Sequence, residues 1–168
     1  MNIEINLSKK SINDAIKKLE TYRDELNDKN ALFVKRLAQI GIDIVEQQIE
    51  IADGDSDKYH TIQLIPHSFG SYSQATIKLD GQDILFIEFG SGIHYNPSDP
   101  KHADKFGYGV GTYPDQTHAF DPNGWWYMDS TGVKQHSYGT RATAPMLTAS
   151  MIIIHEIRRI AREVYGSK

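Results

Sequence analysis

The chain has 168 residues, of which 39% are hydrophobic and 24% charged, proportions typical of a folded protein and not of a disordered one. Its net charge of −4 argues against duplex nucleic-acid binding, which normally relies on an excess of Lys and Arg. The absence of cysteine excludes disulfides and thiolate metal sites. The length favours one domain over residues 1–168.

The N-terminal third is predicted to be mainly helical, after a short strand formed by the alternating Ile3, Ile5 and Leu7. Apolar residues then recur at helical spacing, first at Ile12, Ile16, Leu19, Tyr22 and Leu26, and again at Phe33, Leu37, Ile40, Ile44 and Ile51. The polar residues 27–30 either separate two helices or bend one. Gly41 costs a helix about 1 kcal/mol relative to alanine, so we expect another part of the chain to approach closely there.

Strands are expected in the middle of the chain. Residues 62–65 run into Pro66, and residues 75–79 and 84–89 flank Asp80-Gly81, a pair that favours a hairpin turn. Two more strands are predicted at 125–129 and 133–137. A long loop with little periodicity is expected at 92–122, between the strand at 84–89 and the strand at 125–129. Loops of this length in compact domains are usually functional or disordered. Its aromatic residues favour a loop that another surface covers.

A helix is predicted to begin at Pro145 and to end near Gly166, with apolar residues at helical spacing between them. The longest apolar run in it, Met151 to Ile154, is far too short to cross a membrane. Together the predicted elements indicate an α+β fold. We expect an antiparallel sheet of about four or five strands, packed against long N-terminal helices and one C-terminal helix.

The sequence gives little support for a metal or cofactor site. The acidic stretch that begins at Asp53 starts like a calcium loop, but Lys58 and Leu64 occupy the positions that require Gly and Glu. Histidines and aspartates in the long loop could assemble a metal site, but no closely spaced pair of ligands supports one; they are His94, His102, His118, Asp99 and Asp104. We therefore expect no metal and no cofactor.

One enzymatic alternative stays open. Glu88 and Asp129 are each placed on a predicted strand and could face each other as the carboxylate pair of a small hydrolase acting on cell-wall glycan. A structural role for Glu88, capping backbone amides or pairing with an Arg, explains the same residue equally well. Spacing alone does not favour catalysis.

Both tryptophans of the chain are adjacent, at Trp125 and Trp126, and Tyr127 follows them. Neighbouring residues on a strand point to opposite faces, so the two rings cannot share one side of the sheet. Aromatic residues interleaved with Lys can also bind single-stranded nucleic acid. With a net negative chain, we favour Trp125 and Tyr127 as core or cross-strand residues and Trp126 as an interface residue.

The order of four motifs resembles the tail-component family of tailed bacteriophages, whose members are labelled minor tail, tail-completion or head–tail joining proteins. The resemblance covers more than half of the chain, from about Ile84 to the C-terminal helix. The motifs are Phe89-Gly90-Ser91-Gly92, Gly107-Tyr108-Gly109-Val110-Gly111-Thr112-Tyr113-Pro114, Asn123-Gly124-Trp125-Trp126-Tyr127 and Ala142-Thr143-Ala144-Pro145-Met146.

This resemblance implies a small α+β protein without catalytic activity that forms a ring at the neck of the virion, after assembly in the host cytoplasm. Its partners would be head-completion and tail-tube or tail-terminator proteins, and DNA would pass through the ring without specific binding. The isolated chain can still be a monomer. The resemblance implies a structural role for Glu88, Gly90, Gly92, Gly124, Trp125, Tyr127 and Pro145. In a ring, subunit or partner contacts would fall to Tyr95, Phe106, Tyr108, Tyr113 and Trp126.

Overall fold

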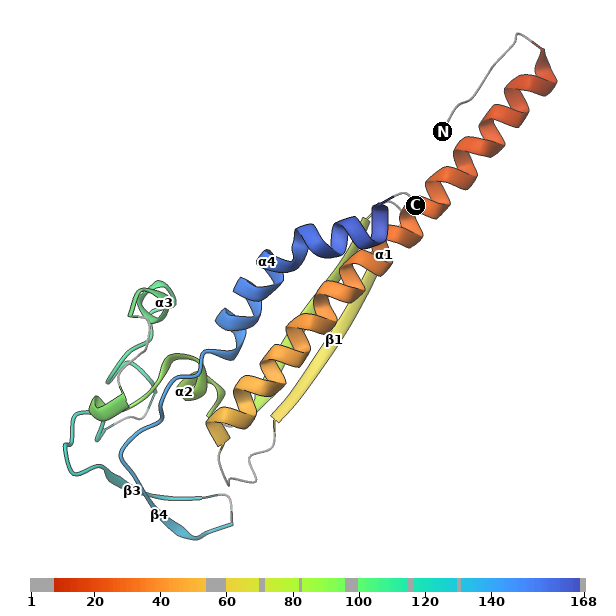
Figure 1. Cartoon of the computed structure of the whole chain (residues 1–168). Helices are drawn as coiled ribbons and strands as arrows, with labels where there is room; N and C mark the ends of the chain where they lie inside the picture. Colours follow the sequence, from red (N-terminus) through yellow and green to blue (C-terminus); the bar gives the residue numbers. More distant parts are fainter. Residues whose placement is uncertain are drawn as a thin grey trace.

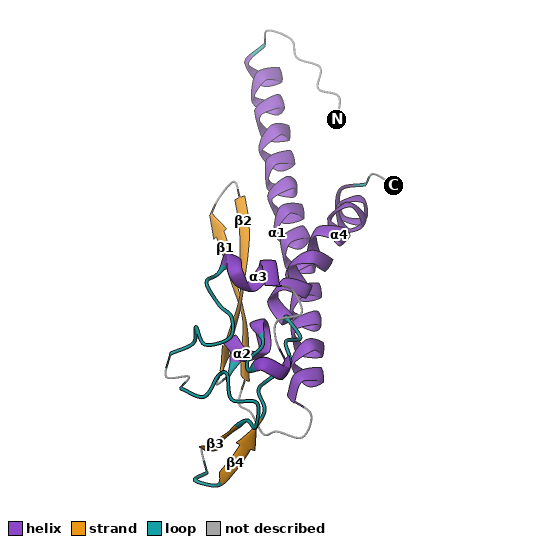
Figure 2. Cartoon of the chain, turned by 90° about the vertical axis from the view of Figure 1, so that its left-hand side faces the viewer, coloured by secondary structure: helices purple, strands orange, loops and turns teal. Residues whose placement is uncertain are grey.

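A computed structural model describes residues 8–53, 60–69, 72–81, 83–95, 100–114, 117–129 and 131–166. The fold is α+β and is dominated by two helices and a long hairpin (Figures 1 and 2). In chain order the elements are α1 (Lys9–Asp53), β1 (His60–Phe69), β2 (Tyr72–Gly81), α2 (Ile84–Phe89), the 3-10 helix η1 (Ile93–Tyr95), α3 (Pro100–Lys105), β3 (Trp125–Met128), β4 (Lys134–Ser137) and α4 (Pro145–Tyr165).

Helix α1 is one continuous helix of 45 residues, so residues 27–30 do not separate two helices, and the expectation of more than one long N-terminal helix was wrong. The polar residues 27–30 contain neither Pro nor Gly. Asn, Asp and Lys each cost less than about 0.7 kcal/mol relative to alanine inside a helix. Ending a helix there would leave backbone groups without intrahelical partners. Continuing the helix is therefore the cheaper solution.

The structure contains a long hairpin, but its two strands are not the pair that the sequence predicted. β1 and β2 pair antiparallel over their full length, from His60 opposite Gly81 to Phe69 opposite Tyr72, so Asp80-Gly81 ends a strand and is not a hairpin turn. Residues 84–89 form the helix α2 and not a strand. The apolar residues Ile84–Ile87 form an unbroken run, which has no alternation to separate a buried strand from a buried helix.

The strands form two separate two-stranded sheets, β1–β2 and β3–β4, and not one sheet of four or five strands. The strands predicted near 125–129 and 133–137 are confirmed as β3 and β4, with Trp126 opposite His136. The strand expected at residues 3–7 lies outside the described residues. The segment expected as a loop at 92–122 contains the short helices η1 and α3.

The main core lies where the C-terminal half of α1 meets the hairpin, α2 and α4. Its buried members are Val45 and Ile49 of α1, Ile87 of α2 and Ala149 of α4. On β2, alternate residues turn towards this core. Gly41 confirms the predicted close approach, because a Cβ atom there would lie 2.5 Å from Ile77 Cδ1 and 2.7 Å from Ile153 Cδ1.

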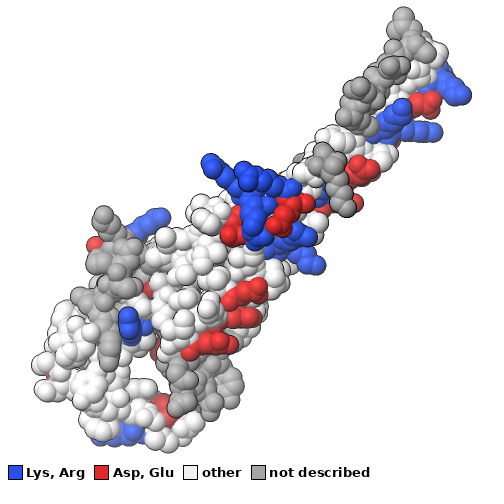
Figure 3. All heavy atoms as spheres, viewed as in Figure 1, with Lys and Arg blue, Asp and Glu red and all other residues white. Residues whose placement is uncertain are grey.

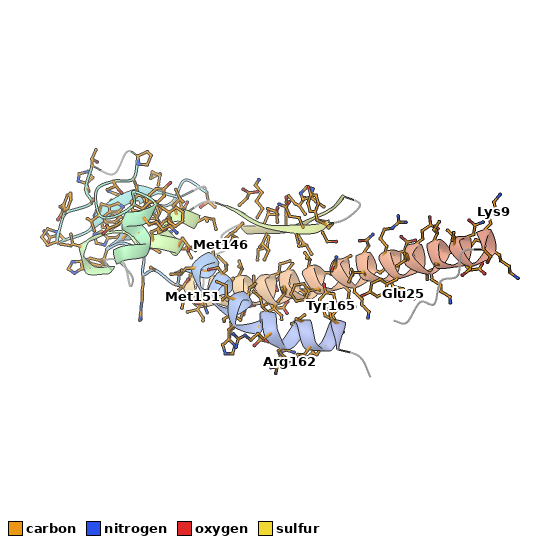
Figure 4. The ribbon with its side chains drawn as sticks, turned by 90° about the horizontal axis from the view of Figure 1, so that it is seen from above. Lys9, Glu25, Met146, Met151, Arg162 and Tyr165 are labelled. Atoms are coloured by element: carbon orange, nitrogen blue, oxygen red, sulfur yellow. The ribbon has the colours of Figure 1, made fainter. Side chains whose placement is uncertain are left out.

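Helix α4 packs antiparallel along α1. The hydroxyl of Tyr165 donates to Asn30 Oδ1 at 2.6 Å, Arg36 pairs with Glu163, and near the other end Thr143 Oγ1 donates to the carbonyl of Gln48. Beyond Asn30, the N-terminal part of α1 extends past the end of α4 (Figure 4). On this extension Ile12, Ile16, Leu19, Tyr22 and Leu26 are 39–52% exposed. We call these five residues the α1 seam.

Candidate assembly surfaces

Glu88 fixes the beginning of α4. Its side chain is only 6% exposed, and its two carboxylate oxygens accept the amide protons of Met146 at 2.8 Å and Leu147 at 3.1 Å. These amides belong to the first turn of α4, where no intrahelical acceptor exists and a negative charge is favourable. Pro145 precedes them in the first turn and is fully buried. The carboxylate of Glu88 therefore takes the role of a helix cap.

The chain entering α4 is tied to two other helices. The amides of Thr143 and Ala144 both donate to the carbonyl of Ile87 in α2, at 3.0 and 3.2 Å, and the Thr143 hydroxyl reaches Gln48 of α1. Ala144 has φ 48°, a left-handed conformation that is uncommon for residues other than glycine. The surrounding hydrogen bonds hold it there, so this motif positions α4 against α1 and α2.

At the glycines of the motifs, another segment of the backbone passes within contact distance. Ser91 pairs with Thr140 through reciprocal backbone hydrogen bonds, and Gly90 and Gly92 on either side both have positive φ. A Cβ on Gly92 would lie 2.6 Å from the carbonyl oxygen of Tyr138. A Cβ on Gly124 would lie 2.2 Å from that of Ser137. Only glycine fits both the conformation and the space.

Two of the predicted contact residues belong to an internal aromatic cluster instead. Tyr113 is buried, packs edge-on against Phe86, and donates its hydroxyl to the carbonyl of Gly90 at 2.5 Å. Burial raises its pKa to about 12, with a further contribution from Tyr108. Tyr108 stacks between Phe89 and Tyr113 and is half-buried. Both tyrosines therefore have aromatic partners within the chain, and their contact with another subunit stays a prediction.

The remaining predicted contact residues differ in position. Phe106 is exposed at the edge of the same cluster. Tyr95 lies at the end of η1, and its side chain is outside the described part of the chain. Trp126 is 60% exposed on the β3–β4 hairpin, where the Lys134 ammonium lies 4.9 Å from its ring centroid. Among the residues expected at an interface whose side chains the structure describes, Trp126 is therefore the most exposed.

The two tryptophans face different surroundings, as the alternation of a strand requires. Trp125 is half-buried, whereas Trp126 packs edge-on against His136, which in turn contacts Tyr138. Other apolar residues of this hairpin are also exposed, with Met128 on the same face of the strand as Trp126 and Tyr127 on the opposite face. We call these exposed residues on both faces the hairpin surface: Trp126, Tyr127, Met128 and Val133.

Asp129 organises the turn of this hairpin. One carboxylate oxygen accepts from the amides of Thr131 and Val133 and from the Thr131 hydroxyl, and the other accepts from Gln135. These hydrogen bonds, led by that of the Thr131 side chain, lower the pKa of Asp129 to about 2. Glu88 and Asp129, the residues of the hydrolase alternative, each serve a separate set of structural hydrogen bonds.

The candidate metal ligands in the long segment are only partly described. His94 Nε2 lies 2.9 Å from the carbonyl oxygen of Pro122. Asp99 and the side chain of His102 lie outside the part of the chain that the structure describes. Among the described residues, no three His, Asp or Glu side chains are grouped to hold a metal ion. No helix in the same set is long and apolar enough to span a membrane.

Two exposed apolar surfaces were not expected from the sequence. One is the α1 seam, which has the spacing of a core-facing stripe. The other lies on α4, where Met151, Ile154 and Ile157 are 62%, 68% and 40% exposed. We call these three residues the α4 outer face. Apolar spacing in the sequence revealed the stripe on α1, but not which part of it lacks a covering element, and it did not reveal the exposed residues of α4.

Comparisons with protein-family models, with curated proteins and with solved structures gave no match.

Proposed function

We propose that this chain is a structural protein of the bacteriophage neck, which completes the tail and joins it to the head as one subunit of a ring. It carries out no catalytic step and needs no cofactor in this role. The phage assignment is based on the ordered motifs between Ile84 and the C-terminal helix. The observation that supports assembly is the presence of two exposed apolar surfaces, the α1 seam and the hairpin surface. They belong to elements at opposite ends of the molecule (Figure 1).

A closed ring of identical subunits uses head-to-tail contacts, so each subunit must present two different surfaces. Exposed apolar patches of this kind mark interaction sites in soluble proteins. The β3–β4 hairpin carries an exposed Trp with a Lys over its ring, and Trp is enriched among residues that dominate binding energy. The net charge of −4 also suits a passage that lets DNA move without holding it.

Electron microscopy of particles from the encoding phage or prophage with this gene deleted tests the proposal. Filled heads and finished tails lying apart are the expected result. Abnormally long tails would move the assignment to tail termination. Normal infectious particles would contradict a structural role and bring the hydrolase alternative forward.

A further inference from the structure

We infer that the α1 seam of one chain docks on the α4 outer face of a second copy. This inference rests on the proposed ring and assigns the subunit contact to two named helices. The two surfaces lie on different elements, and the large apolar side chains of both are 39–68% exposed, whereas Ala15 within the α1 seam is 5% exposed. A single head-to-tail contact would bury both of them, whereas a symmetric contact between two α1 seams would leave Met151 and Ile154 exposed.

The α1 seam continues an interface that already exists within the chain. Farther along α1, the same apolar spacing reaches Phe33, which packs against Tyr165 of α4 at 5.6 Å between ring centroids. Past that point α4 ends and the stripe is exposed (Figure 4). The exposed portion is narrow, with apolar residues at intervals of three or four, a pattern that fits one further helix. A second copy supplies such a helix in its α4.

Charges beside the two surfaces are complementary. An α-helix turns by about 100° per residue, which places Glu20 along one border of the α1 seam and Asp24, which pairs with Arg23 at 2.9 Å, farther round on the same side. The same rotation places Arg162 along the border of the same hand on α4, with Arg158 just inside it, between Ile154 and Met151. Such borders face each other when two helices pack antiparallel, the orientation that α4 already has on its own α1.

The two arginines are available for this contact. Arg158 and Arg162 form no ion pair with another residue in the described part of the chain, whereas Arg159 is held by Glu156 and Glu163. Figure 3 shows the charged side chains gathered towards the end of α4 and an uncharged surface over its first half. Basic side chains therefore border an apolar surface, as at a protein interface with a polar rim.

Paired variants test the contact with the full-length chain. One variant carries Ile16→Gln and Leu19→Gln, and the other carries Met151→Gln and Ile154→Gln; all four positions are exposed or half-exposed, so the fold is retained. Sedimentation velocity over a concentration series is the measurement. The wild-type chain should associate, each variant alone should be monomeric, and an equimolar mixture should form dimers but nothing larger. Ile51→Gln, on an exposed part of α1 outside the seam, is the matched control and should behave like the wild type.

Other outcomes overturn the inference. If the α4 variant associates as the wild type does while the α1 variant does not, the contact is a symmetric one between α1 seams. A wild-type chain that stays monomeric over the whole series excludes this self-association.

Charge exchange gives an independent test. Glu20→Arg with Asp24→Arg should weaken association at least about tenfold, as should Arg158→Glu with Arg162→Glu, and the two changes in one chain should restore it. No restoration would contradict the assigned border.

The two proposals can fail separately. If gene deletion separates heads from tails while the α1 and α4 variants still support infection, the neck assignment stands and this contact is wrong.

Discussion

Both carboxylate oxygens of Glu88 accept amide protons from the first turn of α4, and this residue-scale contact leads to a test of its role. Glu88→Gln presents an NH2 group to one of those amides, so a buried donor loses its acceptor. The free energy of unfolding should fall by about 1–3 kcal/mol, measured by urea denaturation. Glu46→Gln, on an exposed part of α1, should change it little. The hydrolase alternative predicts instead an unchanged stability and a loss of glycan cleavage.

Two glycines of one hairpin separate backbone strain from steric overlap. Gly124 and Gly132 both have positive φ, but a Cβ at Gly124 meets the Ser137 carbonyl whereas one at Gly132 meets nothing within 4 Å. Gly132→Ala should therefore cost about 1–2 kcal/mol from conformation alone, and Gly124→Ala should cost distinctly more. Thermal unfolding of the two variants is the measurement. Equal losses would mean that the contact at Gly124 relaxes without cost.

At the scale of elements, the β3–β4 hairpin should depend on pH through Asp129. Its pKa is lowered from 3.8 to about 2, so the carboxylate is favoured in the folded hairpin. The stabilisation is complete above pH 4 or so and is lost as the pH falls towards 2. NMR spectra of Trp126 and Val133 over an acid titration should report this loss. In Asp129→Asn the hairpin should lack this acid transition, and an unchanged transition would assign it to another group.

Periodicity predicted the elements in which it was strong and failed where it was absent. The 3-4 spacing of α1 and α4 and the short strands β3 and β4 were correctly located from sequence. Residues 84–89 were misassigned because the short apolar run Ile84–Ile87 suits a buried helix and a buried strand equally. The strand partner of β2 was wrong for a related reason: Asp80-Gly81 suits a turn but also ends a strand.

The candidate site was predictable only in part, because local patterns do not show which surface another element covers. Alternation separated Trp125 from Trp126, and the structure leaves Trp126 exposed. Tyr108 and Tyr113 have the composition of a contact loop, yet they pack on Phe89 and Phe86 within the chain. That packing depends on α2 and the segment around Gly111 meeting in space, which sequence spacing does not encode.

For the whole molecule, the exposed position of Trp126 predicts an effect on assembly and not on folding. Trp126→Ala should change the free energy of unfolding by no more than about 0.5 kcal/mol, measured by urea denaturation, because the ring is 60% exposed. It should reduce the ability of the chain to restore infectivity to the deletion phage. Ile51 is 63% exposed and lies outside the α1 seam, the α4 outer face and the hairpin surface, so Ile51→Ala should restore infectivity fully. Unfolding of Trp126→Ala would instead make this residue part of the core.

The antiparallel packing of α4 on α1 also bears on how the chain is synthesised. Contacts such as Tyr165 with Asn30 join residues 135 positions apart, so α1 leaves the ribosome long before its main partner exists. Roughly ninety residues separate the end of α1 from the start of α4, a delay on the order of ten seconds at ordinary rates of translation. During this interval the apolar stripe of α1 has the β1–β2 hairpin and the short helix α2 to pack against, but not α4. The nascent chain should therefore be a substrate for chaperones until α4 emerges.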